Sequence, residues 1–364
     1  YKVNTRSQQY LTHESEIGNN YLQLLGAFDF SFLVVYLIPI LIIVFTYNIL
    51  SSENEQGTWV LLKTSNQSVS KLIFYKILIR YALLTVFFWA VVIAFLLLVI
   101  DSNFLSSGNW WQLFTSVSLY FAFWFALCFF VNSFFKSSDI NLLILLFFWL
   151  FACVIAPNLM QSGIDRAYPI PSRIKMVSKE RQAVNKYYVK EGKKISQELL
   201  DNPLSMIRSR SVVTPELIYA YGVLTFSREQ IMTQASSDMN TQLEGQLLKQ
   251  QTIIQDLMYI TPAVMLQEQL SALTGTHFRH YKAYSADVKQ FKESLIRYFT
   301  PKVVDAKRYH AFDVKDLENI PAFRNKQYYD FSWMNIQLST IYNLLIIAIL
   351  ISFGYIKLLK SRKL

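Results

Sequence analysis

The residues best suited to metal chemistry are three histidines in the second half of the chain. His277 and His280 have the spacing His-x-x-His, and His310 precedes Asp313 and Asp316. Imidazole and carboxylate groups are common metal ligands, so each group is a conceivable metal site. Two histidines without a third fixed ligand form a weak pattern, however, and helix-packing or surface histidines often share it. We therefore expect no metal site.

Motifs for nucleotide hydrolysis and acyl transfer are missing from the sequence. The dipeptide Gly192-Lys193 lacks the upstream glycine of a phosphate-binding loop, so this chain is not expected to hydrolyse ATP. Neither a nucleophile-elbow motif nor His-Glu-x-x-His occurs. Cys128 and Cys153 both lie in apolar runs, where packing is a better explanation than a disulfide or zinc. These features predict a chain that is not an enzyme and holds no cofactor itself.

The elements that must position any site are long apolar runs. Of the 364 residues, 53% are hydrophobic, and they are gathered into blocks rather than spread along the chain. Five blocks are long enough to cross a bilayer as helices. They cover 28–50, 81–100, 113–135, 140–158 and 336–356. The sequence thus predicts an all-α polytopic membrane protein with five spans.

The basic residues of the short loops indicate which ends of the spans face the cytoplasm. The polar insert 51–80 holds four Lys and Arg residues, whereas 101–112 holds none. The C-terminal tail, 357–364, is also basic. By the positive-inside rule, the insert and the C-terminus are expected in the cytoplasm. The net charge of +10 is therefore read as an orientation signal and not as a nucleic-acid surface.

The insert has local signals for a surface helix. Gly57 and Thr58 predict a turn and an N-cap for a short helix that starts at Trp59. Ser68 or Ser70 can cap the span that follows. A helix of this kind would lie across the cytoplasmic face and offer apolar side chains to a partner.

This insert resembles the coupling region of type-2 ABC exporter permeases, whose pattern is roughly Glu-x-Glu-x-Gly-Thr-Leu-x-Leu-Leu, then a Ser-rich turn and a basic residue. The matching residues are Glu53, Glu55, Gly57, Thr58, Leu61, Leu62, Ser65, Ser68 and Lys71. Trp59 replaces the usual leucine but completes the predicted coupling surface. The resemblance implies docking of a cytoplasmic ABC ATPase pair, which would bind ATP and Mg²⁺. It also implies a second permease chain, identical or a paralogue, and a bacterial cytoplasmic (inner) membrane.

The long segment 160–333 is expected to be a separate extracytoplasmic domain. Residues 172–200 and 226–259 show helical periodicity, so the domain should be mainly α-helical. Its Lys and Arg outnumber Asp and Glu, but long segments are translocated largely regardless of charge. Within the flanking spans, Pro39 and Pro157 predict kinks that neighbouring helices must satisfy.

Parts of this domain, together with the first apolar run and the residues just before it, resemble one subfamily, the permeases grouped with those of nitrous-oxide-reductase maturation. The matching residues are Gly26, Asp29, Pro39, Thr261, Pro262, Ala263, Leu266, Leu273, Gly275, Arg279, Phe291, Pro321 and Phe323. Related permeases have six spans, so the resemblance implies that a first span is missing before residue 1. The alternative is an N-terminus that is itself translocated.

The expected organisation has four parts. They are an extracytoplasmic segment 1–27, a transmembrane domain 28–159 with the insert 51–80, the helical domain 160–333, and a last span with its basic tail, 334–364.

Two functions follow as hypotheses. The first is an ABC permease that couples ATP hydrolysis by its partner to export or to movement of the outer domain. The second is a non-transporting membrane scaffold whose outer domain binds an envelope protein. A membrane-bound enzyme is a more distant third. A scaffold has no need of a coupling insert, so the insert favours the permease. The expected surroundings of the permease are membrane lipid, and no nucleic-acid partner is expected.

Overall fold

Helices make up most of the part of the protein that the structure describes. The computed structural model describes residues 29–58, 69–99, 110–134, 137–201, 215–304, 319–323 and 333–361. No strand occurs in these ranges. The chain divides into two compact units. Unit 1 comprises Tyr1–Met160, Leu257–Gly275 and Asp330–Leu364, and unit 2 comprises Gln161–Asp256 and Thr276–Tyr329.

Within the residue ranges that the structure describes, five helical segments are long and apolar enough to cross a membrane, which confirms the predicted fold class. They cover Phe30–Glu53, Ser70–Leu98, Trp110–Asn132, Ser138–Ala167 and Gln337–Lys360. The second begins eleven residues before its predicted start at residue 81, because the helix continues through polar residues that the apolar run does not include. The fourth likewise continues past residue 158.

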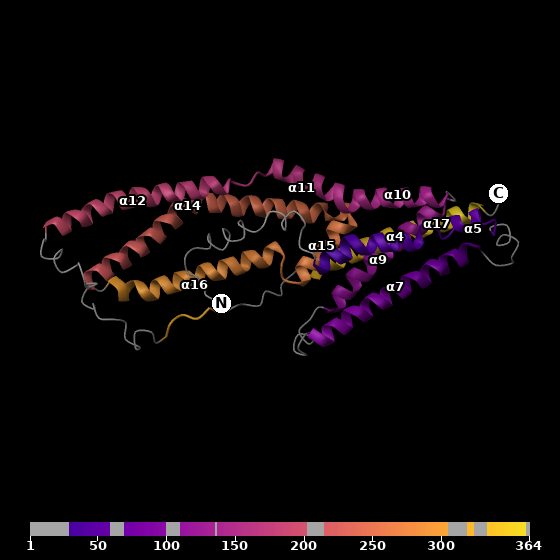
Figure 1. Cartoon of the computed structure of the whole chain (residues 1–364), viewed down its shortest axis with the longest axis horizontal. Coiled ribbons are helices and arrows are strands. Elements are labelled where there is room, and N and C mark those ends of the chain that lie inside the picture. Colours follow the sequence, from indigo (N-terminus) through magenta and orange to yellow (C-terminus); the bar gives the residue numbers. More distant parts are fainter. Residues whose placement is uncertain are drawn as a thin grey trace. The chain divides into compact units, whose positions relative to one another are not determined.

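The first and fourth spans are interrupted helices. The first comprises α3 (Phe30–Phe32), the π-helical segment η1 (Leu33–Leu37), α4 (Ile38–Thr46) and, after a turn, α5 (Ser51–Glu55). The fourth comprises α10 (Ser138–Leu150), the π-helical segment η2 (Phe151–Ile155) and α11 (Ala156–Ala167). The other spans are the continuous helices α7 (Val69–Val99), α9 (Trp110–Asn132) and α17 (Trp333–Ser361) (Figure 1).

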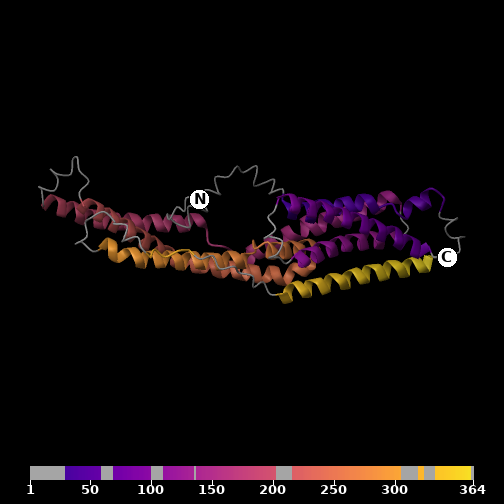
Figure 2. The same ribbon diagram turned by 90° about the horizontal axis from the view of Figure 1, so that it is seen from below.

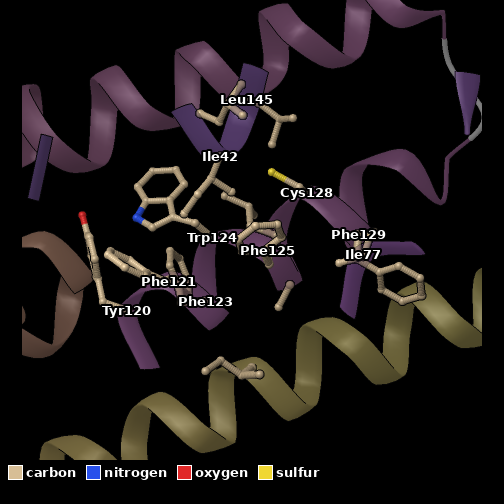
Figure 3. Packing of buried hydrophobic residues seen from close by; sticks show 14 of the residues in the cluster. Ile42, Ile77, Tyr120, Phe121, Phe123, Trp124, Phe125, Cys128, Phe129 and Leu145 are labelled. Carbon is tan, nitrogen blue, oxygen red and sulfur yellow. The ribbon is translucent and has the colours of Figure 1, made fainter. Parts of the chain in front are cut away.

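Helix α9 is the centre of unit 1. In the 18-residue apolar stretch of this span, 72% of the residues are buried, compared with 17 to 33% in the corresponding stretches of the other four spans. Figure 3 shows its aromatic side chains together with Ile42 of α4 and Leu145 of α10. The outward faces of the surrounding helices stay apolar, and Leu98 of α7 is 85% exposed. Such faces are suited to contact with lipid chains.

Helix α17, the yellow helix in Figure 2, packs closely along α9. A Cβ atom added at Gly354 would lie 2.9 Å from the ring of Phe129. A small residue is therefore needed at this crossing, as is common where membrane helices approach closely.

Helix α15 (Pro262–Leu273) belongs to unit 1, although it lies within the sequence range predicted as the outer domain. Thr261 caps its N-terminus through an Oγ1 bond from the Val264 N–H, and Gly275 follows its end at φ +74°. Its buried face, including Leu266 and Leu270, packs against α9, η1 and η2. This apolar face is the reason that the segment clusters with the spans.

Three long helices account for most of the described residues of unit 2. They are α12 (Arg173–Asp201), α14 (Pro215–Leu257) and α16 (Phe278–Val304). The helical segments predicted at 172–200 and 226–259 correspond to α12 and to the second part of α14. Phe323 packs its ring against Tyr284 and Phe291 of α16, with centroids 6.0 and 5.4 Å apart.

Candidate functional site

The described part of the predicted coupling insert folds as a helix followed by a tight turn. Gly57 has φ +75°, a left-handed conformation that glycine adopts without strain. The Thr58 hydroxyl then donates to the Glu53 backbone carbonyl at 3.0 Å and also contacts the Glu53 carboxylate. The turn predicted at Gly57 and Thr58 is therefore present, and the helix that the structure describes is α5, on its N-terminal side.

Glu53 joins this turn to the next span. Its Oε1 accepts a hydrogen bond from the Lys76 Nζ of α7 at 2.6 Å. The Glu53 side chain is 24% exposed and that of Lys76 is 39% exposed, so water screens the pair in part. The pair links α5 to α7 but is expected to contribute little to stability.

Breaking this pair is expected to have a small effect. Lys76→Gln should lower the free energy of unfolding by less than about 1 kcal/mol, because partly exposed ion pairs contribute little. The measurement is unfolding in mixed detergent micelles, repeated at high salt, where the difference from the unmodified protein should shrink. Lys71→Gln is the control, because it removes an exposed charge from the same helix. A loss of several kcal/mol at Lys76 would contradict this assessment.

Glu55 joins α5 to the fourth span. Its carboxylate accepts hydrogen bonds from the Ser138 N–H at 2.7 Å and from the Ser138 hydroxyl at 2.9 Å. The Ser51 hydroxyl also lies 2.8 Å from that of Ser138. A carboxylate at the N-terminus of α10 satisfies backbone donors that have no partner inside the helix, and it is favoured there by the helix dipole.

Two buried asparagines hold the chain between α4 and α5. Asn132 is fully buried, and its amide donates to the carbonyls of Thr46 at 3.0 Å and Cys128 at 2.8 Å. Its Oδ1 accepts from the Leu50 N–H at 3.4 Å. Asn141 of α10 donates to the Tyr47 carbonyl at 3.4 Å. These bonds satisfy backbone groups that the end of α4 exposes inside the bundle.

The structure brings some of the predicted coupling residues together. Glu53 and Thr58 are in contact, Glu55 lies against α10, and Lys71 is exposed on α7. The others, namely Trp59, Leu61, Leu62, Ser65 and Ser68, lie outside the described residues. The structural roles of Asn132 and Asn141 were missed, although an amide next to an apolar run was a usable signal.

His277, the first histidine of the His-x-x-His pair, takes part in hydrogen bonds within the protein. His277 is buried, its Nε2 lies 2.9 Å from the Gln251 amide nitrogen, and its Nδ1 accepts from the Arg279 N–H at 3.1 Å. In the described ranges, no group of three or more potential ligands is close enough to hold a metal ion. His310, Asp313 and Asp316 lie outside those ranges.

Comparison with known proteins gives one family match. A family described as "Domain of unknown function (DUF3526)" matches residues 178–326, which is less than half of the chain. No curated protein and no solved structure matches the chain. The chain is thus a helical protein with five candidate membrane spans and a DUF3526 region between the fourth and the fifth.

Proposed function

We propose that this chain is the membrane-spanning subunit of an ABC transporter. The observation that carries the proposal is the attachment of α5 to two further spans. Glu53 bonds to α7, and Glu55 bonds to the N-terminus of α10. A force applied to the insert would therefore reach the first, second and fourth spans at once. Such rigid-body movement of packed helices is a common form of conformational change.

The insert would receive that force from a cytoplasmic ATPase. This partner would bind ATP and Mg²⁺, while the chain itself would act as a transport subunit and not as an enzyme. An ATPase pair requires a second permease chain, either identical or a paralogue. We place the protein in a bacterial cytoplasmic membrane with its C-terminus inside, and an envelope protein is a candidate partner of the outer domain.

The proposal is tested by removing the apolar docking residues. Leu61→Asp combined with Leu62→Asp should release the ATPase during purification in mild detergent. Residues at the centre of an interface commonly cost about 2 kcal/mol or more when lost, which is roughly a thirtyfold fall in affinity. The measurement is the amount of ATPase retained for each mole of purified permease.

A matched control separates docking from added charge. Ser178→Asp combined with Ser237→Asp adds the same two charges at exposed positions of unit 2 and should retain the ATPase. All variants must unfold at the same temperature as the unmodified protein. Retention of the ATPase by the folded Leu61 and Leu62 variant would overturn the coupling assignment. Recovery of an envelope protein but of no ATPase would favour the scaffold.

A further inference from the structure

The two interrupted spans share one irregularity at the same distance from a proline. Segment η1 ends two residues before Pro39, and η2 ends two residues before Pro157. In each, the N–H that follows the segment bonds five residues back, from Ile38 to Leu33 and from Ala156 to Phe151. The wider turn relieves the clash between a proline ring and the preceding turn. Both spans therefore have a weakened hydrogen-bond ladder there.

Neighbouring side chains bond to the carbonyls of η1. In a regular helix the Val35 carbonyl would bond to the N–H of residue 39, which proline lacks. Instead, the Tyr120 hydroxyl of α9 donates to that carbonyl at 2.8 Å. Cys153 of η2 lies 3.8 Å from the same oxygen and 3.9 Å from the Tyr120 hydroxyl. The Trp149 indole also donates to the Tyr36 carbonyl, at 3.1 Å.

Tyr120 thus occupies the point where the two weakened segments meet. It is 1% exposed and lies at one end of the aromatic cluster of α9 (Figure 3). Helix α15 packs on both η1 and η2. At the opposite end of the same two spans, the bonds of Glu55 and Asn141 join α5 and the end of α4 to α10. The first and fourth spans are therefore linked at both ends, and the π-helical segments lie between the insert and α15.

We propose that η1 and η2 form a paired hinge inside the membrane and that Tyr120 is its positioning residue. The Tyr120 hydroxyl holds the hinge in the observed state because it donates a hydrogen bond to the Val35 carbonyl of η1, next to η2. Release of that bond lets both spans bend at the segments where their own backbone bonds are weakest. The hinge goes beyond the proposed transport function, although transmission from the insert to α15 through it rests on that function.

The two native cysteines report on this hinge. Cys153 lies in η2. Cys128 lies in α9, and its carbonyl accepts from the same Asn132 amide as the Thr46 carbonyl at the end of α4. Both cysteines are buried. The full chain in lipid nanodiscs is treated with N-ethylmaleimide, and the labelling rate of each cysteine is followed by mass spectrometry. Tyr120→Phe should speed labelling of Cys153 about tenfold, the factor expected when a buried carbonyl loses a donor. Cys128 should keep its rate.

Tyr81→Phe is the matched control. The Tyr81 hydroxyl also donates to a carbonyl of the bundle, that of Ser118 at 3.3 Å. Ser118 lies inside α9, where the N–H of Ala122 is available to its carbonyl, so loss of the hydroxyl leaves no gap in the helix. Neither cysteine should change its rate in this variant. Equal acceleration of both cysteines by Tyr120→Phe would mean general loosening and would overturn the hinge.

A second variant separates hinge release from loss of a local contact to Cys153. Pro39→Ala supplies the missing N–H, so combining it with Tyr120→Phe should return Cys153 most of the way to its original labelling rate. A double variant that reacts as fast as Tyr120→Phe alone would overturn the proposal. The labelling needs no ATPase, so its failure is distinguishable from failure of the transport function.

Discussion

A cysteine introduced at Ser237 is expected to react with a membrane-impermeant maleimide in intact cells, whereas one at Gln56 is expected to react only after permeabilisation. Ser237 lies on α14 in unit 2, and Gln56 lies in the turn after α5. Both positions are exposed. By the positive-inside rule, the basic insert and C-terminal tail predict that Gln56 lies inside, and the odd number of spans between the insert and α14 then predicts that Ser237 lies outside.

The native chain supplies the background for this labelling experiment. Cys128 and Cys153 are buried, so the unmodified protein should take up little of the impermeant reagent. Labelling at both new sites after permeabilisation is the control for reactivity. The opposite pattern, with Gln56→Cys labelled and Ser237→Cys protected in intact cells, would invert the orientation and remove the insert from the ATPase side.

Asn132→Leu is expected to lower the free energy of unfolding by about 2 kcal/mol. The substitution keeps the side-chain size but removes its hydrogen bonds to Leu50 and Thr46, so two backbone groups of a buried turn lose a partner. Unfolding of the purified protein by sodium dodecyl sulfate in mixed micelles measures the change.

Asn158→Leu is the control for this substitution. Asn158 is exposed, and its amide donates to the Val154 carbonyl, four residues back in the same span, at 2.7 Å. It should therefore change stability by less than about 0.5 kcal/mol. Equal losses of unfolding free energy from the two substitutions would show that the hydrogen bonds of Asn132 add no particular stability. The turn between α4 and α5 would then be held by other contacts.

The spans were predictable because the bilayer imposes a minimum apolar length, which a single sequence displays directly. The ends of the spans were less predictable. Helix α7 begins at Val69, and the three cationic residues of its first turns led to a predicted start at residue 81. An apolar run marks the part of a helix inside the hydrocarbon, whereas backbone hydrogen bonding continues wherever the chain allows it. The turn at Gly57 was predictable for a local reason, the left-handed backbone that glycine accepts.

The contacts between spans were beyond the sequence. Pro39 and Pro157 predicted two kinks whose freed carbonyls neighbouring helices would have to satisfy. Nothing in the neighbouring sequence identified Tyr120, 81 residues after Pro39, as a hydrogen-bond donor there. Likewise, Glu53 and Glu55 fit a pattern, while their partners Lys76 and Ser138 lie on other spans. Such pairs depend on how the helices pack, which periodicity along one helix does not encode.

The position of α15 limits how far the region between the fourth and fifth spans can be treated as a module. Residues 178–326 recur as one sequence family, and α15 lies inside that range. Its buried residues Ala263, Leu266 and Leu270 nevertheless complete the packing of the spans. A chimera that carried 178–326 on unrelated spans would leave the apolar face of α15 without the surface that it packs against. That surface is formed by α9, η1 and η2. In this chain, the boundaries of the sequence family differ from the boundaries of the packed units.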